Sequence, residues 1–165
     1  MAESFSFDVV SDFERQELVN TLDQVKREIS QRYDLKGTNS KIELDKENIF
    51  ITTNSELTLN AINDIIRQKA IKRNLSLKIF EYCEIEIVSG NKVKQPILLK
   101  QGIKQEIAKI ISKNIRDQIK KISVSINGET LRVSSKSKND LQLAIKLVSK
   151  LEESLNIPLK ANNFR

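Results

Sequence analysis

Apolar and polar residues alternate in several short segments of this chain. In SFSFDVV, Phe5, Phe7 and Val9 stand two positions apart, which predicts a strand with one buried face. KIELDKENIFIT alternates on both sides of a polar turn at 45–48 and predicts a hairpin. SVSINGETLRVSS predicts a second hairpin, because Asn-Gly is a strong turn signal. Further extended segments are expected in LSLKIF, in CEIEIVSGNKVKQPILLK around a turn at 89–91, and in IPLKANNFR.

Four longer segments carry apolar residues at helical spacing. They cover residues 11–33, 54–74, 102–122 and 136–155. The residues expected on their buried faces include Leu18, Leu22, Val25 and Ile29 in the first, Leu57, Ala61, Ile65 and Ile66 in the second, and Ile103, Ile107, Ile110, Ile111, Ile115 and Ile119 in the third. Ser11 or Asp12 is expected to cap the first helix, and Ser137 has capping spacing to Asp140 in the fourth.

The order of elements repeats within the chain. IFITTNSELTLNAI aligns with LRVSSKSKNDLQLAI with one inserted residue. The repeat predicts two ferredoxin-like β-α-β-β-α-β domains of the α+β plait class, each an antiparallel sheet with helices on one face. We expect the domains to cover residues 1–90 and 91–165. A strand exchanged between them, near residue 90 or at the N-terminus, is compatible with the pattern.

The amino-acid composition limits the kinds of catalytic, metal and disulfide site that this chain can contain. The 165 residues contain no histidine and a single cysteine, Cys83, which removes the commonest general base, the commonest zinc ligand and any intramolecular disulfide. No spaced acidic or Gly-rich signature is present, so we expect no enzyme activity, no metal and no cofactor. Apolar runs are too short to cross a membrane, and MAESFSFDVV lacks the features of a signal peptide, so a cytoplasmic protein is expected.

Charge is distributed unevenly along the chain. Residues 1–90 hold 12 Lys and Arg against 16 Asp and Glu, a net charge of −4, whereas residues 91–165 hold 16 against 6, a net charge of +10. A basic second half suggests a polyanionic partner such as nucleic acid or a nucleotide. A lysine-rich solvated surface is the alternative, and charge alone does not separate the two interpretations.

Six ordered blocks resemble the bacterial YajQ family of nucleotide-binding proteins. They are SFDVVS, REISQRYDLKG, RQKAIKRN, LKQGI, LRVSSKSKNDLQ and the terminal NFR, and together they span nearly the whole chain. Asn74 departs from the glycine that the family usually has after the Lys-Arg pair, but both residues adopt the left-handed conformation of a helix C-cap. The resemblance implies two ferredoxin-like domains and nucleotide binding without known catalysis. Some family members bind cyclic-di-GMP and act in signalling and transcriptional control.

The first candidate site is the corner at Lys100, Gln101, Gly102 and Lys104. If Gly102 begins a helix, the free N–H groups of the first turn and the helix dipole favour an anion there. The alternative is a tight turn that needs glycine for a positive φ.

Two further candidates are basic segments. The loop that contains Arg132, Lys136 and Lys138 precedes a helix, where lysine is unfavourable unless an anion compensates it. A solvated loop is the alternative interpretation. The segment RQKAIKR places its cations, Arg67, Lys69, Lys72 and Arg73, near a helix C-terminus, where they are stabilising without a ligand.

Aromatic residues give the last candidates. Phe50 and Phe80 are expected opposite their apolar neighbours, on the open sheet face where RNA-binding modules of this topology stack bases. Packing between the domains is the alternative for both. Phe164 and Arg165 can stack on a base and contact a phosphate. Arg32 and Tyr33 end the first long helix in the block REISQRYDLKG, which contributes to the family resemblance, and closure of the core is an equal explanation for them.

The sequence therefore predicts a non-enzymatic nucleotide-binding protein with a cyclic dinucleotide or a short RNA as ligand. One alternative is an RNA- or DNA-binding protein without small-molecule specificity. Another is an adaptor that binds a protein such as a transcription factor through the acidic residues 1–90.

Overall fold

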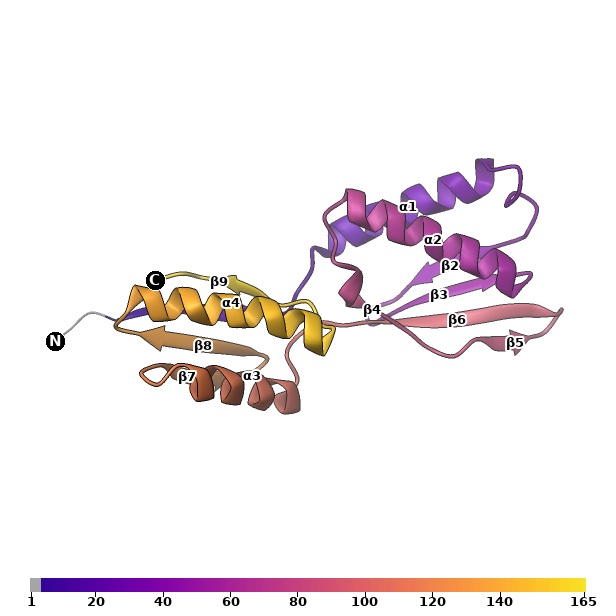
Figure 1. Cartoon of the computed structure of the whole chain (residues 1–165). Coiled ribbons are helices and arrows are strands. Elements are labelled where there is room, and N and C mark those ends of the chain that lie inside the picture. The colour runs from indigo at the N-terminus through magenta and orange to yellow at the C-terminus, as the bar shows by residue number, and fades with distance from the viewer. Residues whose placement is uncertain (1–3) are drawn as a thin grey trace. The chain divides into compact units, whose positions relative to one another are not determined.

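The computed structural model describes residues 4–165 and divides into two compact units (Figure 1). Unit 1 combines Met1–Asp12 with Gln101–Arg165, and unit 2 is the continuous segment Phe13–Lys100. Each unit has its own hydrophobic core. Both are ferredoxin-like, as expected from the repeated pattern.

Unit 1 has the element order β-α-β-β-α-β. Its elements are β1 (Phe5–Val10), α3 (Gln105–Gln118), β7 (Ser123–Asn127), β8 (Thr130–Ser135), α4 (Lys138–Leu155) and β9 (Lys160–Asn162). The strand order is β7-β8-β1-β9, and every pair is antiparallel. Both helices pack on the same face as the buried residues Phe7, Val9, Leu131 and Val133, so the opposite face of this sheet carries no helix.

Unit 2 begins with a helix instead of a strand. Its elements are α1 (Arg15–Gln31), β2 (Lys41–Leu44), β3 (Asn48–Thr53), α2 (Glu56–Lys72), the 3₁₀-helix η1 (Leu77–Ile79), β4 (Phe80–Tyr82), β5 (Glu86–Val88) and β6 (Lys92–Leu99). The strand order is β2-β3-β6-β4, and β5 pairs with the first half of β6. Helices α1 and α2 lie side by side over one face of this sheet (Figure 1).

The two units exchange their first strands. β1 precedes α1 in the chain but pairs with β8 and β9 of unit 1, whereas β6 takes the equivalent place beside β3 in unit 2. The division in the structure therefore differs from the boundary expected at residue 90. The alternating pattern of β6 identifies it as a strand with a buried face, but an alternating pattern does not specify which sheet the strand joins.

Most of the predicted elements are confirmed, with five local corrections. Ile110 is 42% exposed, because it lies off the face of α3 that buries Ala108, Ile111 and Ile115. Leu57 is 82% exposed, because it lies off the buried stripe that runs through Leu59, Ile62 and Ile66 on α2. The first half of LSLKIF is η1 and not a strand. Phe80 is only 4% exposed and belongs to the core. The N-cap of α1 is Glu14, whose side chain makes no capping hydrogen bond, so neither Ser11 nor Asp12 caps this helix.

The exchange of strands also changes the distribution of charge. Unit 2 contains 15 Lys and Arg against 13 Asp and Glu, a net charge of +2. Unit 1 contains 13 against 9, a net charge of +4. The contrast between the acidic and basic halves of the sequence is thus almost absent between the folded units.

Candidate functional site

The corner at Gly102 is closed by backbone hydrogen bonds. Gly102 N–H donates to the Ser11 carbonyl at 2.7 Å, and Ile103 N–H donates to the Glu129 carbonyl at 2.9 Å. Helix α3 begins at Gln105 with Lys104 as its N-cap, three residues after the glycine. The two N–H groups nearest the glycine therefore already have protein acceptors.

The Glu129 side chain lies directly against this glycine. A Cβ atom at Gly102 would come 2.1 Å from Glu129 Oε2, and the φ of Gly102 is +80°. Lys104 Nζ lies 3.4 Å from Glu129 Oε1. Glycine is needed here for its backbone conformation and for this close approach, so the contacts favour the turn interpretation of Gly102 over an anion site. Lys100 is the last residue of unit 2, and its N–H donates to the Ile79 carbonyl. Gln101 is exposed.

Two cations of RQKAIKR join α2 to α1. Lys69 Nζ lies 3.3 Å from Glu28 Oε1, and Arg73 Nη1 lies 3.1 Å from Glu17 Oε2. These side chains are partly exposed, so each pair stabilises the fold by about 1 kcal/mol or less. Their positive charges are neutralised by carboxylates of the same unit, which favours a structural role for this segment.

The other two cations of the segment point elsewhere. Arg67 pairs with Asp64 at 2.8 Å on the same helix and lies 5.0 Å from the ring centroid of Tyr82. Lys72 is exposed, and no carboxylate of the described residues lies within ion-pair distance of it. The structure thus does not gather these four cations into one basic patch.

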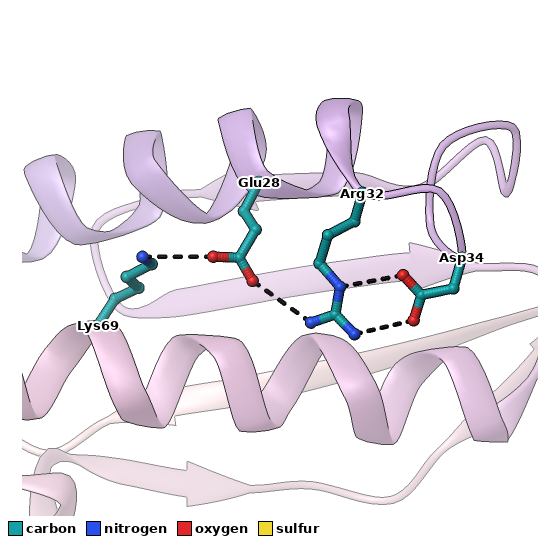
Figure 2. A network of polar contacts seen from close by, with 4 residues as sticks. All are labelled: Glu28, Arg32, Asp34 and Lys69. Atoms are coloured by element: carbon teal, nitrogen blue, oxygen red, sulfur yellow. Dashed lines mark hydrogen bonds and ion pairs between the residues drawn. The ribbon is translucent and has the colours of Figure 1, made fainter.

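The ion pairs continue around the end of α1, as Figure 2 shows. Arg32 donates from Nε and Nη2 to the two oxygens of Asp34, at 3.0 and 2.8 Å, and its Nη1 lies 3.4 Å from Glu28 Oε2. The hydrogen bond from Arg32 lowers the pKa of Asp34, and the same bond raises the pKa of Arg32. Between them Tyr33 is 91% exposed, so it does not close the core.

Arg132 is held on the open face of the unit 1 sheet. Its Nε donates to Asp8 Oδ1 at 3.0 Å, and Asn163 Nδ2 donates to Asp8 Oδ2 at 2.9 Å. The hydrogen bond from Arg132 is the main cause that lowers the pKa of Asp8, and it raises the pKa of Arg132 in return. This network joins β8, β1 and the residues after β9.

The remaining candidates converge on one end of unit 1. Lys138 Nζ lies 4.8 Å from the ring centroid of Phe5, and Lys136 belongs to the short loop between β8 and α4. Phe164 is 64% exposed and packs its ring 6.0 Å from that of Phe7. Arg165 exchanges two backbone hydrogen bonds with Ser6, at 2.9 and 3.1 Å. We call the set of Phe5, Lys136, Lys138, Phe164 and Arg165 the α4 end.

The α4 end combines cations with a helix N-terminus. Ser137 is the N-cap of α4, and its Oγ accepts from Asp140 N–H at 3.2 Å, as the capping spacing predicted. Lys138 occupies the first position of the helix, where a positive charge opposes the dipole. The first turn also contains the acid Asp140, so Lys136 and Lys138 leave an excess of positive charge here, and Phe164 offers an exposed ring against Phe7 of β1. Phe5 was missed as a candidate, because its place beside Lys138 arises only when β1 joins β8.

The sheet faces differ in their capacity to stack bases. In unit 2, Phe50 lies on the open face opposite Pro96, as its alternation with the buried Ile49 and Ile51 predicted, and Lys94 Nζ lies 5.0 Å from its ring centroid. In unit 1 the residues on the open face of the described strands are polar or aliphatic. A row of aromatic residues across a sheet is thus missing from residues 4–165.

Residues 4–165 lack a membrane-spanning helix and a cluster of metal ligands. None of the helices has an apolar stretch of the length and hydropathy required to cross a bilayer. These residues also contain no cluster of three or more Cys, Asp or Glu side chains arranged to hold a metal ion.

Comparison with known proteins agrees with the resemblance found in the sequence. A family model described as "Nucleotide-binding protein YajQ-like" matches residues 5–165. This chain belongs to that family. Among similar proteins, a nucleotide-binding protein of Prochlorococcus marinus strain AS9601 is 89% identical, and one of strain MIT 9211 is 58% identical. In both comparisons the alignment covers 100% of each chain.

Proposed function

We propose that this YajQ-family protein is a non-enzymatic, cytoplasmic nucleotide-binding protein whose ligand phosphate lies at the α4 end. The proposal is supported by one observation above all: Lys136 and Lys138 lie at the N-terminus of α4, and Lys138 contacts Phe5 of β1, the strand whose Phe7 packs against the exposed ring of Phe164. Lysine ammonium groups and helix N–H groups neutralise and orient a phosphate, and an aromatic ring stacks on a base. The names of its relatives agree with this ligand class.

A cyclic dinucleotide such as cyclic-di-GMP is the proposed ligand, with a short single-stranded RNA as the alternative. RNA-binding modules of this fold stack two or three bases on sheet aromatics. Phe50 alone offers this on the described open sheet faces, which favours the small ligand. The adaptor hypothesis depended on an acidic first half of the sequence. It loses that support, because the net charges of the two folded units are +2 and +4.

Isothermal titration calorimetry of the full chain with cyclic-di-GMP, mononucleotides and short RNA tests the proposal. Lys136→Glu with Lys138→Glu should lower affinity for the bound ligand by about tenfold or more, because each substitution replaces an attraction to phosphate by a repulsion. Lys146→Glu with Lys150→Glu is the matched control, since both lysines are exposed on the same helix outside the α4 end.

Two results would contradict the proposal: no nucleotide or RNA binds the wild type, or both double variants bind equally well. The salt dependence separates the two ligands. Single-stranded RNA should lose affinity with a slope of about −0.7 per neutralised phosphate, whereas a dinucleotide with few phosphates should show a much smaller slope.

A further inference from the structure

A hollow of about 340 Å³ opens in unit 2 at the end of α1, between the helix and the loop that leads into β2. Its floor is apolar and consists of Ile29, Leu35 and Ile42. The rest of its lining is polar or glycine and comes from Lys26 and Ser30 of α1 and from Lys36, Gly37, Asn39 and Ser40 of the loop. The volume lies within the range of small-molecule sites in proteins.

The lining of this hollow is basic and contains no acid. Lys26 and Lys36 both line it, whereas none of the lining residues is Asp or Glu. Neither lysine has a carboxylate within 4 Å among the described residues. In contrast, Arg32, Lys69 and Arg73 of the same unit are all paired with carboxylates. The two lysines at the hollow are therefore a local excess of positive charge.

The loop that lines the hollow is held in a fixed conformation. Ser40 Oγ lies 2.7 Å from both Thr38 Oγ1 and Thr53 Oγ1, which anchors the loop to β3. Gly37 and Asn39 both have positive φ angles, of +89° and +58°. Within the described part of the chain, their N–H groups donate to no backbone carbonyl, and both residues line the hollow.

Tyr33 adds an exposed aromatic ring to the same corner. Its side chain is 91% exposed, although the loop around it is fixed by the bidentate Arg32–Asp34 pair (Figure 2). Lys36 Nζ lies 5.8 Å from the centroid of this ring and also lines the hollow. Lys36 therefore lies next to both the Tyr33 ring and the hollow.

Lysines near a helix C-terminus are stabilised by the helix dipole without any ligand. Helix α1 has no basic residue in its last turn, so that effect does not account for Lys26, and it explains neither the hollow nor the exposed tyrosine. We propose that this hollow binds the phosphate of a nucleoside monophosphate through Lys26 and Lys36, with the base stacked on Tyr33. The site shares no residue with the α4 end, and the choice of a nucleotide among phosphate compounds rests on the proposed function.

The test is a titration of the ¹⁵N-labelled full chain with AMP or GMP, followed by NMR, with inorganic phosphate in parallel. The amide signals of Gly37 and Asn39 should shift in a saturable manner. Lys26→Glu with Lys36→Glu should weaken this binding by about tenfold or more. The control Lys41→Glu with Lys46→Glu changes the same charge at two exposed lysines of unit 2 outside the lining and should bind as the wild type does.

Substitution of Tyr33 separates a nucleotide from a free phosphate. Tyr33→Ala should weaken AMP or GMP binding severalfold and leave inorganic phosphate unchanged, whereas Tyr33→Phe should retain both. The inference is overturned if mononucleotides shift only amides at the α4 end, a result that would leave the proposed function intact. It is also overturned if both lysine variants bind alike, or if Tyr33→Ala does not alter nucleotide binding. Absence of all nucleotide binding would contradict both proposals.

Discussion

Asp8 connects three segments of unit 1 through hydrogen bonds to its carboxylate. Its carboxylate accepts from Arg132 of β8 and from Asn163 after β9, so one charge joins the centre of the sheet to both neighbours. Because these hydrogen bonds favour the ionised form, they lower the pKa of Asp8 below its ordinary 3.8. The interaction therefore stabilises the fold above that pH and is lost as the pH falls through the lower folded value.

Asp8→Asn should consequently make stability less dependent on pH in acid. As the pH falls below about 4, the free energy of unfolding of the wild type should fall more steeply than that of the variant. Urea unfolding at a series of pH values measures this difference. Arg132→Ala should flatten the same region of the curve, because it removes the main cause of the lowered pKa. Identical slopes for the wild type and Asp8→Asn would refute the assignment.

The role of Gly102 could not be decided from the sequence, but it can be decided from the fold. As a sequence feature it was compatible with a phosphate site or a turn. In the structure its N–H donates to Ser11, and the Glu129 carboxylate lies where a side chain would otherwise stand. An acid in this position disfavours a second anion, which is why we propose the phosphate site at the α4 end and not at Gly102.

The four helices begin in two different ways. The N-caps of α2 and α4 are Ser55 and Ser137, and each serine Oγ accepts a hydrogen bond from the backbone three residues later. The N-caps of α1 and α3 are Glu14 and Lys104, which make no such bond. The capped helices follow the two hairpins, and the uncapped helices follow the exchanged strands.

This difference predicts opposite effects of substitutions at the helix starts. Ser55→Ala and Ser137→Ala should each lower the free energy of unfolding by about 1 kcal/mol, because they remove a capping acceptor. Glu14→Ser should raise it by about 0.5–1 kcal/mol, because it supplies one. Chemical denaturation measures all three. A destabilised Glu14→Ser would show that Glu14 has a role besides the cap.

The exchange of first strands makes a prediction at the scale of the molecule. Unit 2 contains all its strands within Phe13–Lys100, whereas residues 1–90 lack β6, the strand between β3 and β4. The fragment 13–100 should therefore fold alone with a cooperative thermal transition. The fragment 1–90 should not, because it lacks the buried Val93, Ile97 and Leu99, each worth about 1.5–3 kcal/mol on burial.

Circular dichroism and ¹⁵N-¹H NMR spectra of the two fragments test this expectation. Dispersed amide signals from 13–100 and collapsed signals from 1–90 are the expected result. The opposite result would mean that β6 does not determine the stability of unit 2.

The sequence by itself determined the elements and their local order. Period-two and helical spacing are properties of neighbouring residues, so the hairpins, the helices and the repeated β-α-β-β-α-β pattern could be predicted from them. The residues of the α4 end other than Phe5 could also be named one by one as candidates, because cations near a helix start and an aromatic chain end are visible locally.

Only the tertiary structure decided which strand joins which sheet and which charges meet. β1 and β6 have similar alternating patterns. Only their pairing with strands distant in the chain places β1 in unit 1 and β6 in unit 2. The partners of Arg132, Lys69 and Arg73 are distant in the chain, so their neutralisation could not be predicted from spacing. The hollow at Lys26 and Lys36 arises for the same reason: α1 and the loop before β2 enclose it only when both pack on one core.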